Sequence, residues 1–572
     1  MAAAADQSRG LAQAQENQSS IFYMGPRYPV LDRWGQTNIR GLYLAGDVAG
    51  TPDIKAAING GAAVARRLVA EEPGEREPDV EYDVIVVGAG PAGVSAAMEL
   101  RRAGQRVLVI ERTRAFSAIR GLGVERELFL ASTGSPKVDG PLWFGDCRAG
   151  ELLARWTQTL DESGFPINEN EELREIKKIG AVFRVTTSRG EYRAARVIAA
   201  IGRLHFLKKV GVEEVPVAEM PLEFFRRCGI VYERDWHIQR YALFVLSCLL
   251  VGAFYVIKKF NPHLITIGGL GLDKLYTILY SAIIFGFGIR SIVVWRRRRW
   301  REAEGSGGSQ TLRLLSLIFC QVFFFWILPD YIVKDWRAGN VLYPWPLGLR
   351  PTTFAAYLEK PFYLWAALIG TLVALPIVVQ FHGKKFCTWV CGCGGLAETL
   401  GDPWRHYSPK GTINTKREKW IYLVTGFTAV STVLVGFGYD LRLFGLRLSI
   451  LYDLTVDLAL IAIIPVAMYF FLGGKTWCRY WCPVVGWMNL VGKKTSRFQV
   501  SADRKRCITC GMCDRYCEVG VPVMRFAVKG ESFGMDNSSC IGCGICIQVC
   551  PTDVLQFGPP RREGQPVFRI LR

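Results

Sequence analysis

The pattern of apolar and polar positions divides the chain into a polar first part, an apolar middle and a short polar end. From about residue 240 onward, six apolar stretches approach the length of about 20 residues that a helix needs to cross a bilayer. These stretches are 240–257, 274–295, 311–329, 362–381, 419–437 and 454–472. They predict a six-span transmembrane domain over residues 240–495, and with it a multidomain membrane protein.

Residues 79–220, before the spans, carry the pattern of a Rossmann-like α/β domain. Tyr82–Val87 is a run of the kind that forms a buried strand, an alanine-rich helix follows, and Arg106–Ile110 is a second strand run that ends in Glu111. Residues 1–78 form a segment of their own. They contain another strand, turn and helix pattern and end in an acidic, proline-containing linker over 71–79.

Composition agrees with this division. Half of the 572 residues are hydrophobic and the mean hydropathy is +0.17, which is high for a soluble protein. A chain of this length exceeds one hydrophobic core, so about two to four domains are expected. The seventeen cysteines stand mostly in cluster-like spacings, which indicates a reducing compartment rather than disulfides.

The net charge of +19 is explained by the membrane rather than by nucleic acid, because the chain has no nucleic-acid recognition module. Basic residues crowd the polar ends of the predicted spans. The positive-inside rule then places both termini and the soluble domains in the cytoplasm, with the spans in the inner membrane. The basic residues are Arg226, Arg227, Arg296–Arg299, Arg301, Lys384, Lys385, Lys416, Arg417, Lys419, Lys475, Lys493 and Lys494.

Candidate metal chemistry is concentrated in residues 496–572, where cysteines occur in two runs with the spacing C-x2-C-x2-C-x3-C. The first run is Cys507, Cys510, Cys513 and Cys517, and the second is Cys540, Cys543, Cys546 and Cys550. Three sulfurs at these short spacings surround one [4Fe–4S] cluster, while the fourth reaches elsewhere. The zinc-ribbon alternative is weaker, because two runs of four cysteines are poor zinc spacing.

The two runs resemble bacterial dicluster ferredoxins, in which the fourth cysteine of each run ligates the other cluster. The resemblance implies an α+β domain with two [4Fe–4S] clusters. It assigns Cys550 to the cluster of the first run and Cys517 to the cluster of the second run. After Cys517 the first run has Glu518 where the second has Pro551, so the two turns need not match.

Two glycine-containing segments before the predicted spans are candidates for a cofactor site. Gly88-Ala89-Gly90-Pro91-Ala92-Gly93 stands between a strand and a helix, where glycines allow a tight turn and the close approach of a pyrophosphate. Glu111 supplies an acid for the ribose hydroxyls. The second segment, Gly41–Ala49, reads GLYLAGDVA, and a helix-like stretch follows it. An ordinary strand, turn and helix is the alternative for this second segment.

Both segments resemble the thioredoxin-reductase-like flavoproteins, as does the closing turn at Ala200–Gly202. In that family the aspartate of the GD pair contacts the ribityl chain, and the next helix points its N-terminus at the isoalloxazine ring. The resemblance therefore implies FAD bound by Gly88, Gly90, Pro91, Ala92, Gly93, Glu111, Gly202, Gly46 and Asp47, and by the backbone of Ile54, Lys55 and Ala56.

Two features depart from that family. The closing GD motif precedes the opening glycines in this chain, and we find no second glycine-rich strand–helix turn for a nicotinamide-binding domain. The simplest interpretation is a circularly permuted single FAD domain. The alternative is a partial domain, fused from the tail of a truncated larger flavoprotein.

A matching pair of cysteine motifs stands where predicted spans four and six end. Cys387 and Cys391 follow Lys384 and Lys385, whereas Cys478 and Cys482 follow Lys475. The first motif has Gly392 where the second has a proline, and it adds Cys393. Four thiols at one membrane depth could hold a third iron–sulfur cluster. Structural thiols without a metal are the alternative.

The membrane block and its ferredoxin tail, over about residues 310–555, resemble two groups of membrane proteins. One comprises the quinol dehydrogenases of periplasmic nitrate reduction, and the other comprises the maturation proteins of nitrous-oxide reductase and cytochrome oxidase. The resemblance implies electron exchange with a quinone. Haems stacked across the membrane on paired histidines are not available, because the chain has only five histidines.

Asp457 is a candidate for proton coupling, because an acid inside a membrane span is costly and marks function by default. The alternative is a span that starts later and leaves Asp453 and Asp457 among the outer headgroups.

The sequence thus predicts a membrane-bound oxidoreductase that passes electrons between FAD, [4Fe–4S] clusters and the quinone pool, within a larger respiratory complex. The expected partners are a quinone or quinol, with either further subunits or a soluble electron carrier, and not nucleic acid. A reductase that supplies electrons for the maturation of a metalloenzyme is the alternative. A scaffold without flavin is a third hypothesis, against which bound FAD would argue.

Overall fold

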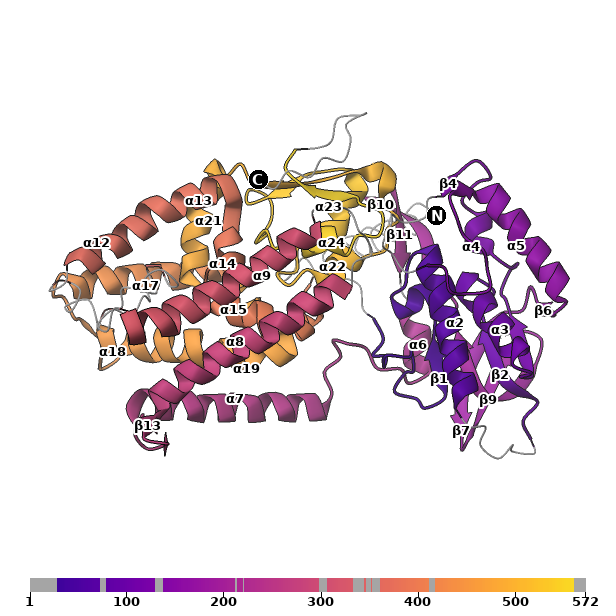
Figure 1. The fold of residues 1–572 in the computed structure, drawn as a ribbon, viewed down its shortest axis with the longest axis horizontal. Helices are drawn as coiled ribbons and strands as arrows, with labels where there is room; N and C mark the ends of the chain where they lie inside the picture. Colours follow the sequence, from indigo (N-terminus) through magenta and orange to yellow (C-terminus); the bar gives the residue numbers. More distant parts are fainter. Residues whose placement is uncertain are drawn as a thin grey trace, which may run out of the picture.

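The computed structural model describes residues 28–71, 79–128, 137–210, 213–219, 221–297, 306–332, 344–345, 351, 358, 361–410 and 417–559. Most of the predicted linker over 71–79, and the basic residues Arg298, Arg299, Arg301 and Lys416, lie outside these ranges. Figure 1 shows an α/β domain at one end, a body of long helices at the other, and the C-terminal residues packed along one side of the helical body.

The α/β domain is built on one sheet that takes strands from both sides of the 71–79 linker. The sheet runs β6-β3-β2-β9-β8-β7, with β1 also beside β9. Its strands are β1 (Leu42–Leu44), β2 (Tyr82–Val87), β3 (Val107–Ile110), β6 (Ile167–Asn168), β7 (Leu173–Ile179), β8 (Val182–Thr187) and β9 (Glu191–Ala199). Strand β1 pairs parallel with the end of β9, so residues 28–71 complete the domain of the residues that follow them.

Two helices lie side by side on this sheet, α2 (Ile54–Ala70) and α3 (Pro91–Arg102) (Figure 1). Their close approach requires Gly61, because a Cβ there would lie 2.0 Å from the carbonyl oxygen of Ala92. The Ser95 hydroxyl on α3 donates to the carbonyl oxygen of Ile58 on α2 at 2.8 Å. This contact joins the helix after the GD motif to the helix after the glycine-rich turn.

Smaller elements complete the α/β domain. They are α4 (Ser117–Arg120), α5 (Ala149–Ser163), the pair β4 (Glu127–Leu128) and β5 (Cys147–Arg148), the hairpin β10 (Leu204–Val210) and β11 (Glu213–Glu219), and α6 (Leu222–Arg227). Trp156 of α5 is fully buried and donates from its indole nitrogen to the carbonyl oxygen of Trp143 at 2.7 Å.

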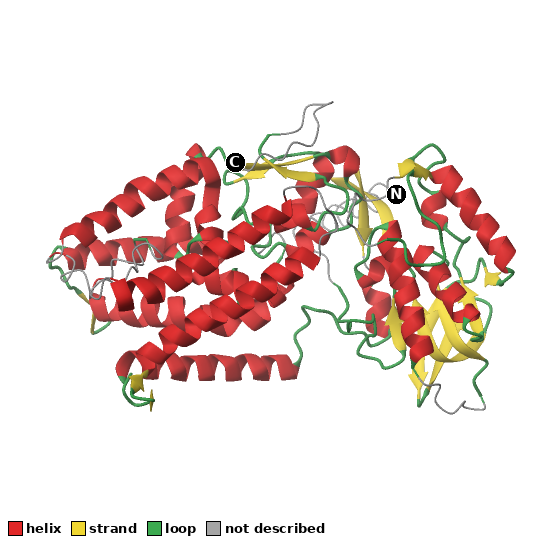
Figure 2. Ribbon diagram, in the orientation of Figure 1, coloured by secondary structure: helices red, strands yellow, loops and turns green. Residues whose placement is uncertain are grey.

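Among the residues that the structure describes, five helical segments are long and apolar enough to cross a membrane. They are Ile238–Phe260, Leu272–Arg296, Ser309–Ile332, Leu364–Trp389 and Leu448–Leu472. A further apolar helix, α17 (Trp420–Gly436), has 17 residues, fewer than the usual spanning length of about 20. Five spans are therefore supported, while the sixth stays a prediction. Figure 2 shows that this part of the molecule is almost wholly helical.

The helical body comprises α7 (Ile238–Phe260), α8 (Leu272–Arg297), α9 (Ser306–Val322), α12 (Pro361–Ile369), α13 (Leu375–His382), α17, α18 (Leu448–Tyr452) and α19 (Ile464–Leu472). Three π-helical stretches, Phe323–Ile332, Gly370–Ala374 and Asp453–Ile463, continue or join these helices.

Asp457 lies in the last of these π-helical stretches and is paired. Its carboxylate is 2.9 Å from the ammonium nitrogen of Lys259, which also lies 3.5 Å from Asp453. Lys259 is in the last turn of α7, so Asp457 stands level with the end of a neighbouring span. The ion pair offsets the cost of placing an acid there. A role in proton coupling stays a prediction.

The C-terminal domain is a small α+β unit. Strand β16 (Gln499–Ala502) lies between β17 (Phe533–Gly534) and β18 (Leu555–Phe557), with α22 (Met512–Tyr516), α23 (Val523–Lys529) and α24 (Ile545–Gln548) around it. Its core contains Val500, Val521, Phe533 and Leu555, against which the cysteines pack.

A buried ionic network joins this domain to the helical body. Glu398 is paired with Arg313 at 2.8 Å, Arg405 at 2.9 Å and Lys475 at 3.6 Å, and Arg405 also reaches Glu518 at 3.6 Å. The side chains of all five are at most 2% exposed. Burial alone would raise the pKa of Glu398, but Arg313, Lys475 and Arg405 lower it to about 2, so its carboxylate is charged at neutral pH.

We predict that Glu398→Ala strongly destabilises the protein. The change leaves three buried cations with one carboxylate fewer, and breaking a buried ion pair in this way typically costs about 3–5 kcal/mol. Thermal unfolding of the detergent-solubilised protein, followed by circular dichroism, measures the effect. The matched control is Glu223→Ala, which removes a carboxylate from an exposed pair with Arg227 and should leave the unfolding temperature nearly unchanged. Equal unfolding temperatures for the two variants would contradict this assignment.

Candidate redox centres

The glycine-rich turn leaves open space in front of a helix N-terminus. A Cβ on Gly90 would meet no atom within 4 Å, and no side chain caps the first amides of α3, which Pro91 opens. Gly88 and Gly93 are needed for the turn itself. A Cβ added at Gly88 would lie 2.4 Å from the carbonyl oxygen of Ala200, and a Cβ added at Gly93 would lie 1.9 Å from the carbonyl oxygen of Gly88. Backbone amides at a helix N-terminus favour a phosphate.

Glu111, at the end of β3, lies beside this turn. Its carboxylate accepts from the backbone amide of Ala89 at 2.8 Å and from that of Thr113 at 3.0 Å. The carboxylate is therefore held next to the glycines, where a ribose attached to a bound pyrophosphate would lie.

The GD segment is brought against the same turn, although it stands far away in the sequence. A Cβ on Gly46 would lie 2.9 Å from the Cβ of Ala92. Asp47 forms an ion pair with Arg203, the residue after Gly202. Ile54, Lys55 and Ala56 begin α2, where Asp53 caps the helix by accepting from the Ala56 amide at 2.7 Å. The open cradle and the adjacent acids fit FAD, a cofactor that accepts and returns two electrons.

The two cysteine runs have matching backbones. In each run, the residue before the second cysteine has a positive φ, Thr509 in the first run and Gly542 in the second. The residue after that cysteine, Gly511 or Gly544, also has a positive φ. The Val521 amide donates to the Cys517 sulfur at 3.3 Å, and the Val554 amide donates to the Cys550 sulfur at 3.4 Å. The turn after Cys517 therefore forms the same N–H···S bond without a proline.

The structure brings the two cysteine runs together, because α22 packs against α24. Burial raises the pKa of Cys507 to about 11, and the Cys550 thiol adds to the rise. Burial raises the pKa of Cys540 to about 12, and the Cys543 and Cys517 thiols add to it. Following the exchange that the ferredoxin resemblance implies, we call Cys507, Cys510, Cys513 and Cys550 the first cysteine group, and Cys540, Cys543, Cys546 and Cys517 the second cysteine group.

Within the described part of the chain, no three His, Cys, Asp or Glu side chains converge closely enough to hold a single metal ion. A cubane carries each sulfur on a different iron and takes four cysteines, as each group supplies. The two groups fit [4Fe–4S] clusters, which accept and return one electron each.

The paired motifs at the ends of the helical body are built alike. Each reads G-K-x2-C-x3-C, from Gly383 to Cys391 and from Gly474 to Cys482. In each, the first cysteine lies in a short helix, α14 (Phe386–Trp389) or α20 (Thr476–Tyr480). The second cysteine precedes the first residue of the next helix, α15 (Gly392–Thr399) or α21 (Pro483–Thr495).

Lys475 links the two motifs. Its ammonium group is fully buried and donates to the carbonyl oxygen of Cys387 at 2.9 Å, across the gap between the motifs. Cys387, Cys391, Cys478 and Cys482 are all less than 9% exposed. The thiol of the additional Cys393 hydrogen-bonds to Cys391 and, with Lys475 nearby, lowers the pKa of Cys391 to about 7. The motifs thus place five thiols in one buried region.

The second cysteine group faces the helical body. Gln310 donates to the carbonyl oxygen of Cys543 at 2.6 Å, and Lys410 donates to that of Cys517. Lys384 of the first paired motif is buried. The side chain of Lys385 would meet a Cβ on Gly542 at 2.8 Å.

Sequence reasoning missed Arg203, which no motif singles out, and it treated Glu518 only as a departure from the proline of the second run. It does place Lys384 and Lys475 beside the thiols of the paired motifs, where their positive charge offsets the negative charge of the thiolates.

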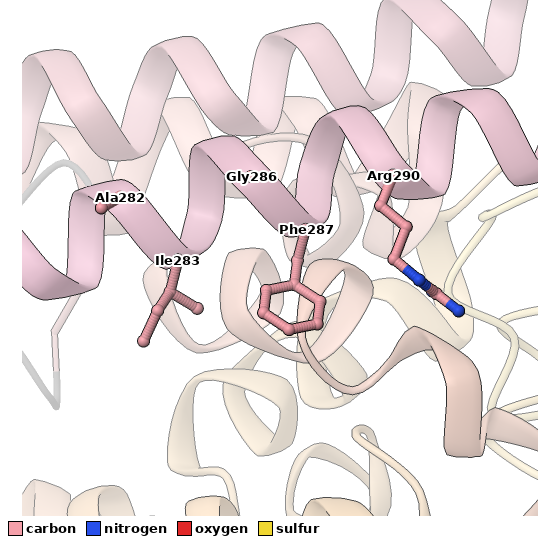
Figure 3. Close-up of a pocket in the computed structure, with 5 residues that line it drawn as sticks. All are labelled: Ala282, Ile283, Gly286, Phe287 and Arg290. Atoms are coloured by element: carbon pink, nitrogen blue, oxygen red, sulfur yellow. The ribbon is translucent and has the colours of Figure 1, made fainter.

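Figure 3 shows a hollow on the side of α8, lined by Ala282, Ile283, Gly286, Phe287 and Arg290. Its lining is apolar apart from the Arg290 guanidinium. None of its residues is among the site residues predicted from the sequence.

Three family models match parts of the chain. Residues 85–221 match the model described as pyridine nucleotide-disulphide oxidoreductase, and residues 506–554 match a 4Fe-4S dicluster domain. A third model, described as a 4Fe-4S binding domain, matches twice, at 363–409 and 454–499. These matches confirm the flavoprotein-type and ferredoxin-type resemblances, and they identify the chain as an oxidoreductase of the electron-transfer class.

Individual relatives fall into the same two groups. The electron transport protein YccM of Escherichia coli (strain K12) is 25% identical over 250 residues, which cover 39% of this chain and 68% of YccM. Thioredoxin reductase of Aquifex aeolicus is 45% identical over 67 residues, or 12% of this chain and 19% of that protein. Ferredoxin–NADP reductase of Streptococcus pneumoniae (strain G54) is 29% identical over 21% of this chain and 35% of its own length.

Among solved structures, bacillithiol disulfide reductase from Staphylococcus aureus aligns with a TM-score of 0.21 at 25% identity, over 23% of this chain and 42% of that one. The chain thus spans less than half the length of each flavoprotein relative named here.

We predict that Gly90→Val abolishes flavin binding without unfolding the domain. The new side chain would enter the open space in front of α3 and displace a pyrophosphate, whereas no protein atom lies within 4 Å of the added Cβ. Flavin absorbance of the purified protein and circular dichroism measure the two effects. Gly190→Val is the matched control, because it also adds atoms in open space but away from the turn. Full flavin occupancy in Gly90→Val would refute the site.

Proposed function

We propose that this protein is a membrane-bound oxidoreductase that carries electrons between FAD and the quinone pool through iron–sulfur clusters. The observation that carries the proposal is the contact between the first paired motif and the second cysteine run: a Cβ on Gly542, between Cys540 and Cys543, would lie 2.8 Å from the Lys385 side chain. The ferredoxin-type cysteines and the membrane-edge cysteines are therefore neighbours, and they offer a continuous route for electrons.

Part of this proposal is a third [4Fe–4S] cluster, held by Cys387, Cys391, Cys478 and Cys482. Cys393 is a substitute ligand. The two matches to a 4Fe-4S binding domain support it, because each match contains one of the paired motifs. Burial of the four thiols and the Lys475 link between the motifs support it further. Buried lysines next to thiolates stabilise their negative charge.

The membrane location of the route supports a quinone as the lipid-soluble partner. The paired motifs stand at or just past the ends of two apolar helices, Leu364–Trp389 and Leu448–Leu472. We place that end at the cytoplasmic face of the inner membrane, because basic residues are concentrated there. The protein's own residues exclude water from the thiols and hold the α/β domain, the helical body and the C-terminal domain together. FAD would supply the conversion between electron pairs and single electrons.

We predict that Cys387→Ser and Cys482→Ser each lower the iron content of the full-length protein by about four atoms, the content of one [4Fe–4S] cluster. Chemical iron analysis of protein purified without oxygen measures the loss. Cys320→Ser, which removes a buried cysteine of α9 outside both motifs, is the control and should leave the iron content unchanged. Unchanged iron in both motif variants would rule out the third cluster.

The proposed function predicts that the protein, with its clusters chemically reduced, is reoxidised by a quinone analogue in detergent, and that Cys387→Ser slows this reaction. The route to the membrane would be interrupted, while both ferredoxin-type clusters would remain. Visible absorbance of the clusters follows the reaction, again with Cys320→Ser as control. If the wild-type protein does not react with quinone, the quinone-linked function is wrong.

A further inference from the structure

The α/β domain contacts the C-terminal domain at the first cysteine group. Tyr28 is 2% exposed, and its hydroxyl donates to the carbonyl oxygen of Cys510 at 3.2 Å. Its backbone is fixed by the segment that leads to the first span, because the Glu233 amide donates to the Tyr28 carbonyl oxygen at 3.0 Å. The ring of Tyr28 is thus held between the flavin-type domain and a predicted cluster ligand.

Arg515 closes the same contact from the other side. It lies on α22, between Cys513 and Cys517, and its guanidinium carbon stands 4.1 Å from the centre of the Tyr28 ring. It also forms an ion pair with Glu233. A Cβ on Gly50 would lie 2.8 Å from an Arg515 nitrogen, and Gly50 ends the short helix that contains Asp47. The GD segment and α22 are therefore packed directly together.

Arg203 places a buried positive charge between the two sites. Its side chain is 3% exposed and pairs with Asp47, the residue that the flavoprotein resemblance places at the ribityl chain. Its charge also acts on Tyr28 and Cys510. A cation in this position stabilises negative charge on either neighbour, and charges close to a cluster tune its potential.

The second cysteine group contacts the helical body beside the first paired motif. The carbonyl oxygens of Cys543 and Cys517 accept from Gln310 and Lys410, and a Cβ on Gly542 would lie 2.8 Å from the Lys385 side chain. The contact with Tyr28 therefore belongs to the first group, and the contact with the first paired motif belongs to the second.

We propose that electrons pass between the flavin and the first cysteine group across the contact formed by Tyr28, Arg203 and Arg515, and that the second group serves the membrane side. One electron moves at a time: the reduced flavin loses it and the cluster of Cys507, Cys510, Cys513 and Cys550 gains it. After two transfers the protons released from the flavin go to solvent. This inference rests on the proposed function, because it requires FAD and both clusters.

The order is tested by redox titration of the full-length protein, with each cluster followed by electron spin resonance. Cys510→Ser and Cys543→Ser assign the two cluster signals. Arg203→Gln removes the buried cation, so the potential of the first cluster should fall while that of the second stays unchanged. The matched control is Arg193→Gln, which removes a half-exposed cation paired with Asp79 on the same domain and should change neither potential. A shift of the second cluster instead, or of neither cluster, would overturn the assignment.

A second variant keeps the test independent of flavin retention in Arg203→Gln. Glu233→Gln weakens the pair that holds Arg515 against Tyr28, without touching the glycine-rich turn. Light-driven reduction of the flavin, followed by the bleaching of cluster absorbance, should show electron transfer several-fold slower than in the wild type, at unchanged iron and flavin content. If the wild-type protein shows no transfer, the proposed function itself fails. If the wild type transfers and Glu233→Gln is equally fast, only the order fails.

Discussion

The structure depends on one buried cation, the ammonium group of Lys475. It donates to the carbonyl oxygen of Cys387 and pairs with Glu398, so it fixes the two cysteine motifs relative to each other. Glu398 in turn holds Arg405, and Arg405 reaches Glu518 beside Cys517. A buried charge is tolerated only with partners. The same pairs that neutralise Lys475 therefore join the ferredoxin-type domain to the helical body.

Local patterns predicted the parts of this molecule whose determinants lie close together in the sequence. The cysteine spacing anticipated the two runs, because three ligands of each group stand within one short turn, whereas the exchange of the fourth members rests on the ferredoxin resemblance and stays a prediction. Likewise, the glycines at 88 and 93 are dictated by close backbone contacts inside one strand–helix unit. The apolar runs anticipated long helices for the same reason, although α17 is shorter than a usual span.

The rest could not be predicted, because it depends on partners that are distant in the sequence. That the GD segment belongs to the FAD domain follows from the family resemblance, but the parallel pairing of β1 with β9 is visible only in the structure. Glu518 reads as a missing proline, yet the turn forms without it and the carboxylate pairs with Arg405. Arg203 and Tyr28 carry no motif, and their place between two cofactor sites follows only from the packing of two domains.

The central claim is a continuous row of cofactors from the flavin-type domain to the membrane edge. Electron cryo-microscopy of the full-length protein, purified without oxygen, tests it most directly. The account predicts FAD at Gly90 and Asp47, one cluster beside Tyr28, a second beside Lys385, and a third between Cys387 and Cys482. An empty paired-motif site, or a single metal ion in place of either ferredoxin-type cluster, would contradict it.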